Sequence, residues 1–112
     1  MLKYQRNLSE KRAAATNNEA LREKLIATIE NDVLLKAKSC ERLPAGIRLS
    51  VDRTTMRINS MRTIDEIVGF FSNAIHSERG IVVQDALHRE GLSGFEDIKD
   101  KINMIYEQGI SY

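Results

Sequence analysis

Three short segments of the sequence have the form Ser/Thr-x-x-Glu, which is typical of the first turn of an α-helix. They are Thr16–Glu19, Thr63–Glu66 and Ser93–Glu96. In this capping box the hydroxyl oxygen accepts from the backbone N–H three residues later, and the glutamate reaches back to the N–H of the first residue. The three boxes therefore predict three helix starts in a chain that is mostly helical.

The first of these helices is expected over about 17–41. At 100° per residue its core face is an apolar stripe, formed by Ile26, Ile29, Val33, Ala37 and Cys40. Leu34 and Leu35 lie off this stripe, and Leu35 is opposite it. The helix is therefore expected either to be buried between two layers or to meet a second copy of itself.

Leu43-Pro44-Ala45-Gly46 is expected to end the first helix, because proline cannot continue it and glycine permits a reversal. Residues 46–60 then read GIRLSVDRTTMRINS. Apolar and polar residues alternate on both sides of Asp52-Arg53-Thr54. This period of two predicts a β-hairpin with a three- to four-residue connection. The polar face of the hairpin would then hold Arg48, Ser50, Thr55, Arg57 and Asn59, with Arg53 at the tip and Arg62 at the base.

A helix with a clean apolar stripe is expected from Thr63 to about Ser77, and another from Ser93 to near Gly109. Residues 81–89 fit either a short helix ending at Gly91 or a third strand, and we favour the helix. The predicted fold class is α+β: a long N-terminal helix, the hairpin, and two or three C-terminal helices. Residues 1–16 are expected to be a flexible segment and 17–112 a single domain.

Charge is distributed unevenly although the net charge of the 112 residues is only +1. Residues 36–62 hold seven basic and two acidic side chains, whereas residues 85–107 hold three basic and six acidic ones. Arginine offers a rigid fork of donors suited to phosphates, carboxylates and guanine edges. We therefore predict that an acidic macromolecule binds at Arg48, Arg53, Thr55, Arg57, Asn59 and Arg62. A one-sided antiparallel sheet would also show such a polar face without any partner.

Catalytic and metal-binding patterns are weak. His76 and His88 each begin a His-x-Glu triplet, which on a helix points the two side chains about 200° apart, unlike a metal site. Cys40, the single cysteine, lies on the expected core stripe and so lacks the open setting of a nucleophile. No phosphate-binding glycine loop and no serine elbow occurs. We expect no enzyme, no cofactor and no metal.

Residues 54–92 are similar to the ribbon-helix-helix DNA-binding proteins. Thr55, Arg57 and Asn59 resemble the outward residues of the strand that reads the DNA major groove, and 63–77 resembles the first helix. The resemblance implies a nucleic-acid-binding regulator that forms dimers through its strand. The pattern departs from the family after the turn, where Val82-Val83 stand in place of a capping Ser or Thr.

The sequence thus predicts a small non-enzymatic binding protein, an adaptor, inhibitor or regulator, that recognises a macromolecular partner. A nucleic-acid-binding regulator is the alternative, and a small-ligand binder or enzyme the second one. A homodimer is expected because apolar side chains lie off their helix stripes at Leu34, Leu35 and Phe70. The chain shows no signal-peptide pattern and no long apolar run, so we expect a cytoplasmic protein without a membrane partner.

Overall fold

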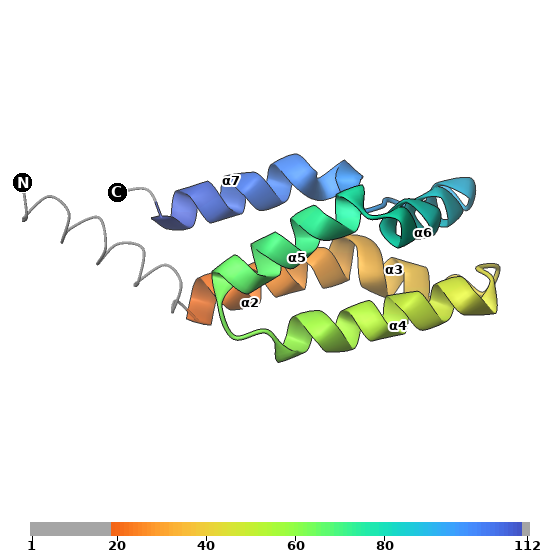
Figure 1. Cartoon of the computed structure of the whole chain (residues 1–112), viewed down its shortest axis with the longest axis horizontal. Coiled ribbons are helices and arrows are strands. Elements are labelled where there is room, and N and C mark those ends of the chain that lie inside the picture. The colour runs from red at the N-terminus through yellow and green to blue at the C-terminus, as the bar shows by residue number, and fades with distance from the viewer. Residues whose placement is uncertain (1–18, 111–112) are drawn as a thin grey trace, which may run out of the picture.

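The computed structural model describes residues 19–110, and every regular element in that range is a helix (Figure 1). The elements are α2 (Glu19–Ile29), the π-helical segment η1 (Glu30–Leu34), α3 (Leu35–Lys38), α4 (Ala45–Ser60), α5 (Ile64–His76), α6 (Glu78–Arg89), the 3-10 segment η2 (Glu96–Ile98) and α7 (Lys99–Ile110). The predicted α+β fold is therefore wrong. The expected flexible segment 1–16 and the capping box at Thr16 lie outside the described residues.

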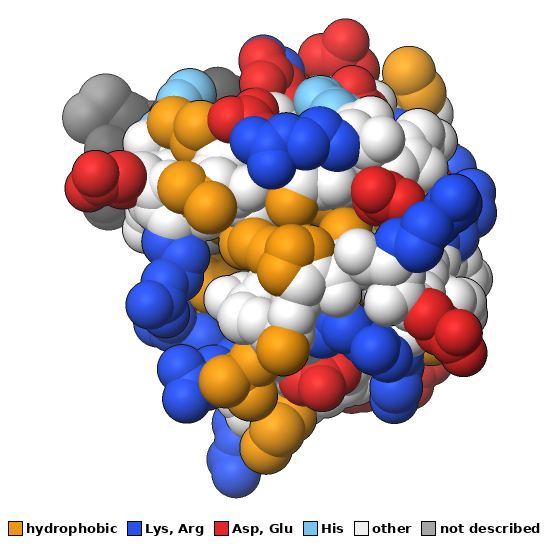
Figure 2. Space-filling model, turned by 90° about the vertical axis from the view of Figure 1, so that its right-hand side faces the viewer, with side chains coloured by type: hydrophobic (Ala, Val, Ile, Leu, Met, Phe, Trp, Pro, Cys, Tyr) orange, Lys and Arg blue, Asp and Glu red, His pale blue; other side chains and the backbone are white. Residues whose placement is uncertain are grey.

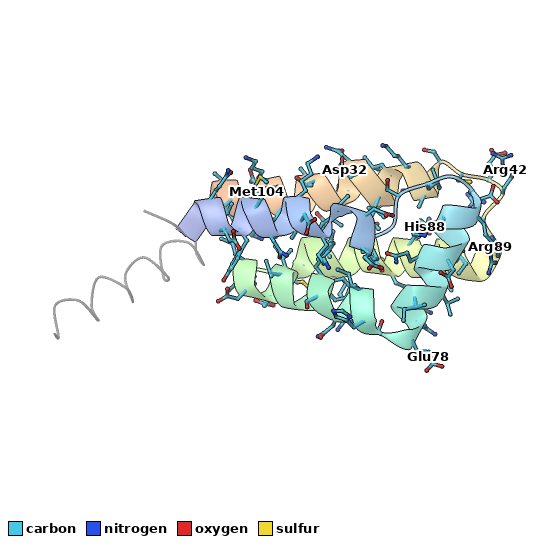
Figure 3. The ribbon with its side chains drawn as sticks, turned by 90° about the horizontal axis from the view of Figure 1, so that it is seen from above. Asp32, Arg42, Glu78, His88, Arg89 and Met104 are labelled. Atoms are coloured by element: carbon cyan, nitrogen blue, oxygen red, sulfur yellow. The ribbon has the colours of Figure 1, made fainter. Side chains whose placement is uncertain are left out.

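The long helices form a bundle in which successive members alternate in direction (Figure 1). α2, η1 and α3 follow one another as a single rod, α4 returns beside it, α5 runs back, and α7 returns again. α6 lies across one end of this bundle, as the view from above shows (Figure 3). α4 packs on η1, α3 and α6, whereas α5 packs on α2, α6 and α7.

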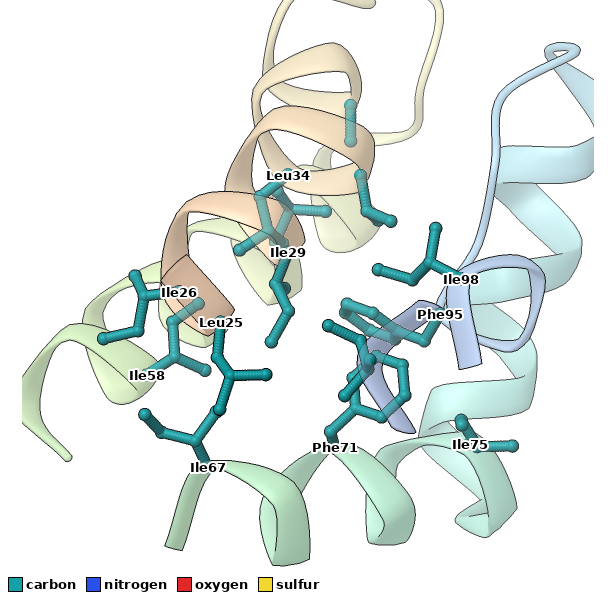
Figure 4. Close-up of a cluster of buried hydrophobic side chains, with 14 of the residues drawn as sticks. Leu25, Ile26, Ile29, Leu34, Ile58, Ile67, Phe71, Ile75, Phe95 and Ile98 are labelled. Atoms are coloured by element: carbon teal, nitrogen blue, oxygen red, sulfur yellow. The ribbon is translucent and has the colours of Figure 1, made fainter. Parts of the chain in front are cut away.

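The core lies between α2, α4, α5 and α7. Figure 4 shows side chains from α2, η1, α4 and α5 meeting Phe95 and Ile98, which precede α7. Its fully buried large side chains are Leu25, Ile29, Val33, Leu34, Ile58, Ile64, Ile67, Leu87 and Ile102. Phe71 and Phe95 contact each other edge to face, with ring centroids 5.9 Å apart. Burial of this one cluster is the main stabilising contribution to such a fold.

The predicted hairpin at 46–60 is instead the helix α4. Its inner face is formed by Ile47, Val51 and Ile58, which are spaced by four and seven residues and therefore share a helix face. Pro44 occupies the N-cap position, where its missing N–H costs nothing. It therefore begins α4, whereas the previous helix already ends at Lys38. With residues 54–60 helical, the strand on which the ribbon-helix-helix resemblance depended is absent.

The end of α4 is held by a side chain from another helix. The guanidinium of Arg22 in α2 donates to the backbone oxygens of Met61 at 2.7 Å and Asn59 at 3.2 Å. These carbonyl groups are among those that a helix end leaves without intrahelical partners. The contact ties α4 to α2, and it joins residues almost forty positions apart.

The first helix is shorter than predicted and contains the π-helical turn η1. A π turn closes its hydrogen bonds over five residues instead of four and so rotates the following residues around the axis. Val33 and Leu34 are therefore both buried, whereas Leu35 remains 47% exposed. This rotation corrects the prediction that Leu34 lies off the core stripe. Cys40, predicted on that stripe, follows the end of α3 and is half-buried against the core.

The predicted C-terminal helices are present, but the predicted capping box at Ser93 is wrong: η2 begins at Glu96 after Phe95 without a side-chain cap, and α7 begins at Lys99. α5 begins at the Thr63 cap, whose hydroxyl accepts from the N–H of Glu66 at 3.1 Å. Residues 81–89 are helical, and Gly91 follows α6 with a positive φ of 73°. Among residues 19–110, no helix is both long and apolar enough to cross a bilayer.

Candidate partner-binding site

The six predicted partner-binding residues do not form one surface, because α4 turns them to different sides. Arg48 and Arg57 lie about 180° apart around the helix at 100° per residue. Arg53 and Arg57 border a cleft toward α5 and α6. Arg48 is exposed near the start of α4, and Arg62 is exposed in the connection to α5. The predicted set is therefore divided, and only part of it belongs to a concave site.

Two members of the predicted set make contacts within the fold. The side-chain amide of Asn59 donates to Glu30 Oε1 at 2.7 Å and to the backbone oxygen of Thr55 at 2.8 Å. The hydroxyl of Thr55 donates to the backbone oxygen of Val51 at 3.0 Å. These groups hold α4 together and fasten it to η1.

The cleft beside α4 has a volume of about 330 Å³ and is formed by three helices. α4 contributes one wall, α5 and its end a second, and the first turns of α6 a third, with Phe95 below them. The lining residues are Ser50, Arg53, Thr54, Arg57, Phe70, Asn73, Ala74, Ser77, Arg79, Gly80, Val83 and Phe95. We call this site the arginine cleft, after Arg53, Arg57 and Arg79.

The arginine cleft carries positive charge that the fold does not neutralise. No aspartate or glutamate is among its lining residues. Within residues 19–110, Arg53, Arg57 and Arg79 form no ion pair, whereas Arg42 pairs with Glu90 at 3.0 Å. Glu78, next to Arg79 in the chain, points away from the body of the protein (Figure 3). The cleft is therefore suited to a group of negative charge.

The floor of the arginine cleft is apolar and partly aromatic. The guanidinium carbon of Arg57 lies 5.0 Å from the centroid of the Phe70 ring, which places the cation against the ring face. Phe95 is 5% exposed and Val83 is 7% exposed, so both belong to the core as well as to the floor. A ligand in the cleft would thus meet charge at the rim and hydrocarbon below.

An apolar ridge runs along the outer side of α4, next to the arginine cleft. It contains Leu49, which is 49% exposed, and Met56, which is 73% exposed. These two side chains are seven residues apart and lie within about 20° of each other around the helix. Arg53 lies between them in the chain and toward the cleft, so that ridge and cleft are continuous.

The residues predicted for self-association differ in exposure. Leu34 is 2% exposed and belongs to the core, which removes it from any interface. Phe70 is half-buried beneath Arg57 and packs against the core. Leu35 alone is exposed, at 47%. The surplus apolar surface on which the homodimer was predicted is therefore mostly covered within one chain.

A second, shallower groove lies between the start of α4 and α6. Its lining includes Pro44, Ile47, Val82 and Ala86, with Asp85 and Arg89 at its edges. Figure 2 views this end of the molecule and shows apolar side chains gathered between charged ones. The opposite charges of Asp85 and Arg89 give this groove no net preference for a charged ligand.

Outside the arginine cleft, His88 and Asp97 form a close pair of titratable side chains. His88 Nε2 lies 2.5 Å from Asp97 Oδ2, and the same oxygen accepts from the N–H of Gly94 at 2.7 Å. The Gly94 hydrogen bond first, and the His88 contact second, lower the pKa of Asp97. Both side chains are more than two-fifths exposed, so the pair is a surface contact between α6 and η2.

No group of three or more His, Cys, Asp or Glu in the described part of the chain could hold a metal ion. Sequence reasoning had missed Arg79, whose only signal was its charge, because local pattern does not connect that charge with α4. It had singled out Phe70 of α5, but for self-association and not for this cleft. Comparisons with protein-family models, with curated proteins and with solved structures found no match for this chain.

Proposed function

We propose that the protein is a non-enzymatic binding domain that recognises an acidic protein partner through the outer surface of α4. The observation that carries the proposal is the arginine cleft, where three arginines line one cavity without any carboxylate. Arginines without an acidic partner in the described fold suit carboxylate or phosphate groups of a binding partner.

The apolar ridge favours a protein partner over a nucleic acid. Leu49 and Met56 present exposed apolar surface, and methionine adapts its shape to different partners. Asp52 lies on the same outer side of α4 and would repel a phosphate backbone. Protein interfaces commonly combine such an apolar centre with a charged rim. A nucleic-acid-binding role, the alternative from the sequence, would have to place phosphates against this ridge.

The proposal is tested by panning a library of random linear peptides against the protein and two double variants. R53S/R57S removes two charges from the arginine cleft, and R48S/R62S removes the same charge elsewhere. We expect the wild type and R48S/R62S to select peptides with acidic residues beside apolar ones. R53S/R57S is expected to bind those peptides about 2- to 30-fold more weakly, because each of the two exposed ion pairs contributes only about 0.2–1 kcal/mol.

Two results would contradict the proposal. One is equal loss of peptide binding in both double variants, since it would show a general effect of net charge. The other is tight binding of a short DNA duplex that depends on Arg53 and Arg57. In that case the logarithm of affinity would fall with the logarithm of salt by about 0.9 per phosphate contact. Circular dichroism checks that the exposed substitutions leave the fold intact, as expected for changes of under about 0.5 kcal/mol each.

Two further predictions from the sequence accompany this proposal. A homodimer would now depend on Leu35, and sedimentation of the wild type and of Leu35→Glu tests it. A dimer that persists in Leu35→Glu would place the contact elsewhere. The cytoplasmic location stays a prediction.

A further inference from the structure

The arginine cleft has two chemically different parts, and together they define a narrower ligand than an acidic peptide. Its rim carries the guanidinium groups of Arg53, Arg57 and Arg79, and its floor carries Phe70 and Phe95. A cavity of about 330 Å³ lies in the size range of sites for small organic groups. The carboxylate of a short acidic side chain of a partner would contact the arginines at the rim but would not contact the aromatic floor.

The charge at the rim exceeds what one carboxylate can neutralise. A phosphate monoester carries a charge of about −1.5 to −2 at neutral pH and has three acceptor oxygens. Several arginines around one phosphate can each donate paired hydrogen bonds to it. Arg79 also lies in the first turn of α6, where the helix dipole adds a small positive potential. The rim therefore matches a phosphate monoester better than a monoanion.

The aromatic floor of the arginine cleft is suited to a flat apolar group attached to that phosphate. Phe70 already holds the Arg57 guanidinium against its face at 5.0 Å, which orders this arginine before any ligand binds. Phe95 is fixed from below by its edge-to-face contact with Phe71. Aromatic rings favour further rings in offset or edge-on contact. An aryl phosphate would place its ring on this floor and its phosphate among the arginines.

We propose that the arginine cleft binds an aryl phosphate, and that its source is a phosphotyrosine side chain of the partner. This inference rests on the proposed function, because it takes the ligand to be part of a protein. It adds that recognition depends on phosphorylation of the partner. The apolar ridge at Leu49 and Met56 would then contact the residues beside the phosphotyrosine.

The test uses N-acetyl-O-phosphotyrosine amide as the probe, titrated into ¹⁵N-labelled full-length protein and followed by NMR. The comparison ligands are the unphosphorylated tyrosine amide, the phosphoserine amide, inorganic phosphate and adenosine monophosphate. We expect the phosphotyrosine probe to bind at least about tenfold more tightly than each of them, with shifts in the backbone signals of α4, α5 and α6 that line the cleft.

Variants locate the binding. Arg57→Gln and Arg79→Gln are each expected to weaken the probe about tenfold or more, because each removes a charged donor from the phosphate. Arg48→Gln is the matched control: it removes the same charge from an exposed site elsewhere on α4 and should change the affinity less than about twofold. All three sites are exposed, so folding should be unaffected, and the unliganded NMR spectra check this.

Several outcomes would overturn the inference. Equal affinity for inorganic phosphate would show that the aromatic floor is not used. Adenosine monophosphate binding as tightly as the probe would assign the cleft to a free nucleotide. Equal weakening by Arg48→Gln would reduce the effect to net charge. If the wild type selects unphosphorylated acidic peptides but does not bind the probe, this inference fails and the proposed function stands. If the probe binds at the cleft but no acidic peptide is selected, the inference stands and unphosphorylated acidic sequence is not what the surface recognises.

Discussion

Replacing Gln84 with methionine is expected to lower the free energy of unfolding by about 2–3 kcal/mol. Gln84 is 9% exposed and is a buried polar side chain that joins α6 to η2. Its amide nitrogen donates to Glu96 Oε2 at 3.0 Å, and its amide oxygen accepts from the N–H of Glu96 at 2.7 Å. Methionine keeps the length and the apolar stem of the side chain but can make neither bond.

The magnitude follows from these two bonds. A neutral hydrogen bond contributes about 0.5–1.5 kcal/mol net, and one to a charged acceptor contributes up to about twice as much. Part of the charged contribution is lost to solvent because Glu96 is exposed. Gly94 packs closely against the stem of Gln84, since a Cβ added at Gly94 would lie only 2.5 Å from Gln84 Cγ. The side chain at position 84 therefore has no room to move and compensate for the lost hydrogen bonds.

The assay is thermal and urea unfolding of Gln84→Met beside Gln108→Met. Gln108 is exposed on α7, so the same chemical change there should alter stability by less than about 0.5 kcal/mol. The Gln84 variant should melt roughly 10–20 °C lower. Equal stability of the two variants would refute the reasoning, because it would mean that the Gln84–Glu96 contact contributes nothing net.

Three further predictions use matched pairs or pH. Gly80→Ala should lower the free energy of unfolding by more than about 2 kcal/mol, because the added Cβ would lie 1.6 Å from a backbone oxygen of α5. Gly69→Ala, where the added Cβ meets open space, should raise the free energy of unfolding by about 0.5–1 kcal/mol. Urea melts compare the two variants. Leu34→Ala should cost about 2–5 kcal/mol and Leu35→Ala far less, and similar losses in the same assay would contradict the core position of Leu34. Asp97→Asn should be less stable than the wild type at pH 7, because the pKa of Asp97 in the folded protein lies below its ordinary value of 3.8. In urea melts at decreasing pH, the difference in stability should disappear as the pH falls through the folded pKa. A difference that does not change with pH would contradict this prediction.

Local sequence determined the helices whose signals agree with one another. α5 has a capping threonine, an apolar stripe of period 3.6 and a polar end, so its bounds and its buried face were predictable from Thr63 to Ser77. α6 was favoured as a helix, and Gly91 ended it because only a residue without a Cβ readily adopts its positive φ. Ile98, Ile102 and Ile105 are spaced by four and three residues, as one helix face requires, and all three are buried.

Tertiary structure alone decided the state of residues 46–60. Ile47, Val51 and Ile58 fit one face of a helix, and with Leu49 and Met56 added they also fit the alternation of a strand. The choice depends on which apolar residues are buried, and that depends on the surface offered by η1, α3 and α6. In the folded protein Ile47, Val51 and Ile58 pack in or against the core, whereas Leu49 and Met56 remain exposed.

The arginine cleft could be predicted only in part, for the same reason. The sequence pointed to Arg53 and Arg57 through local charge, but it also included Arg48, Thr55 and Asn59, which a helix turns away from the cleft. Arg79 of α6 and Phe70 of α5 are remote from Arg53 in the chain, and only the packing of α6 against both α4 and α5 brings them to one cavity. The charge and type of each residue are given by the sequence. Which residues meet in one cleft is decided by the folded chain, because it depends on distances between segments that are remote in sequence.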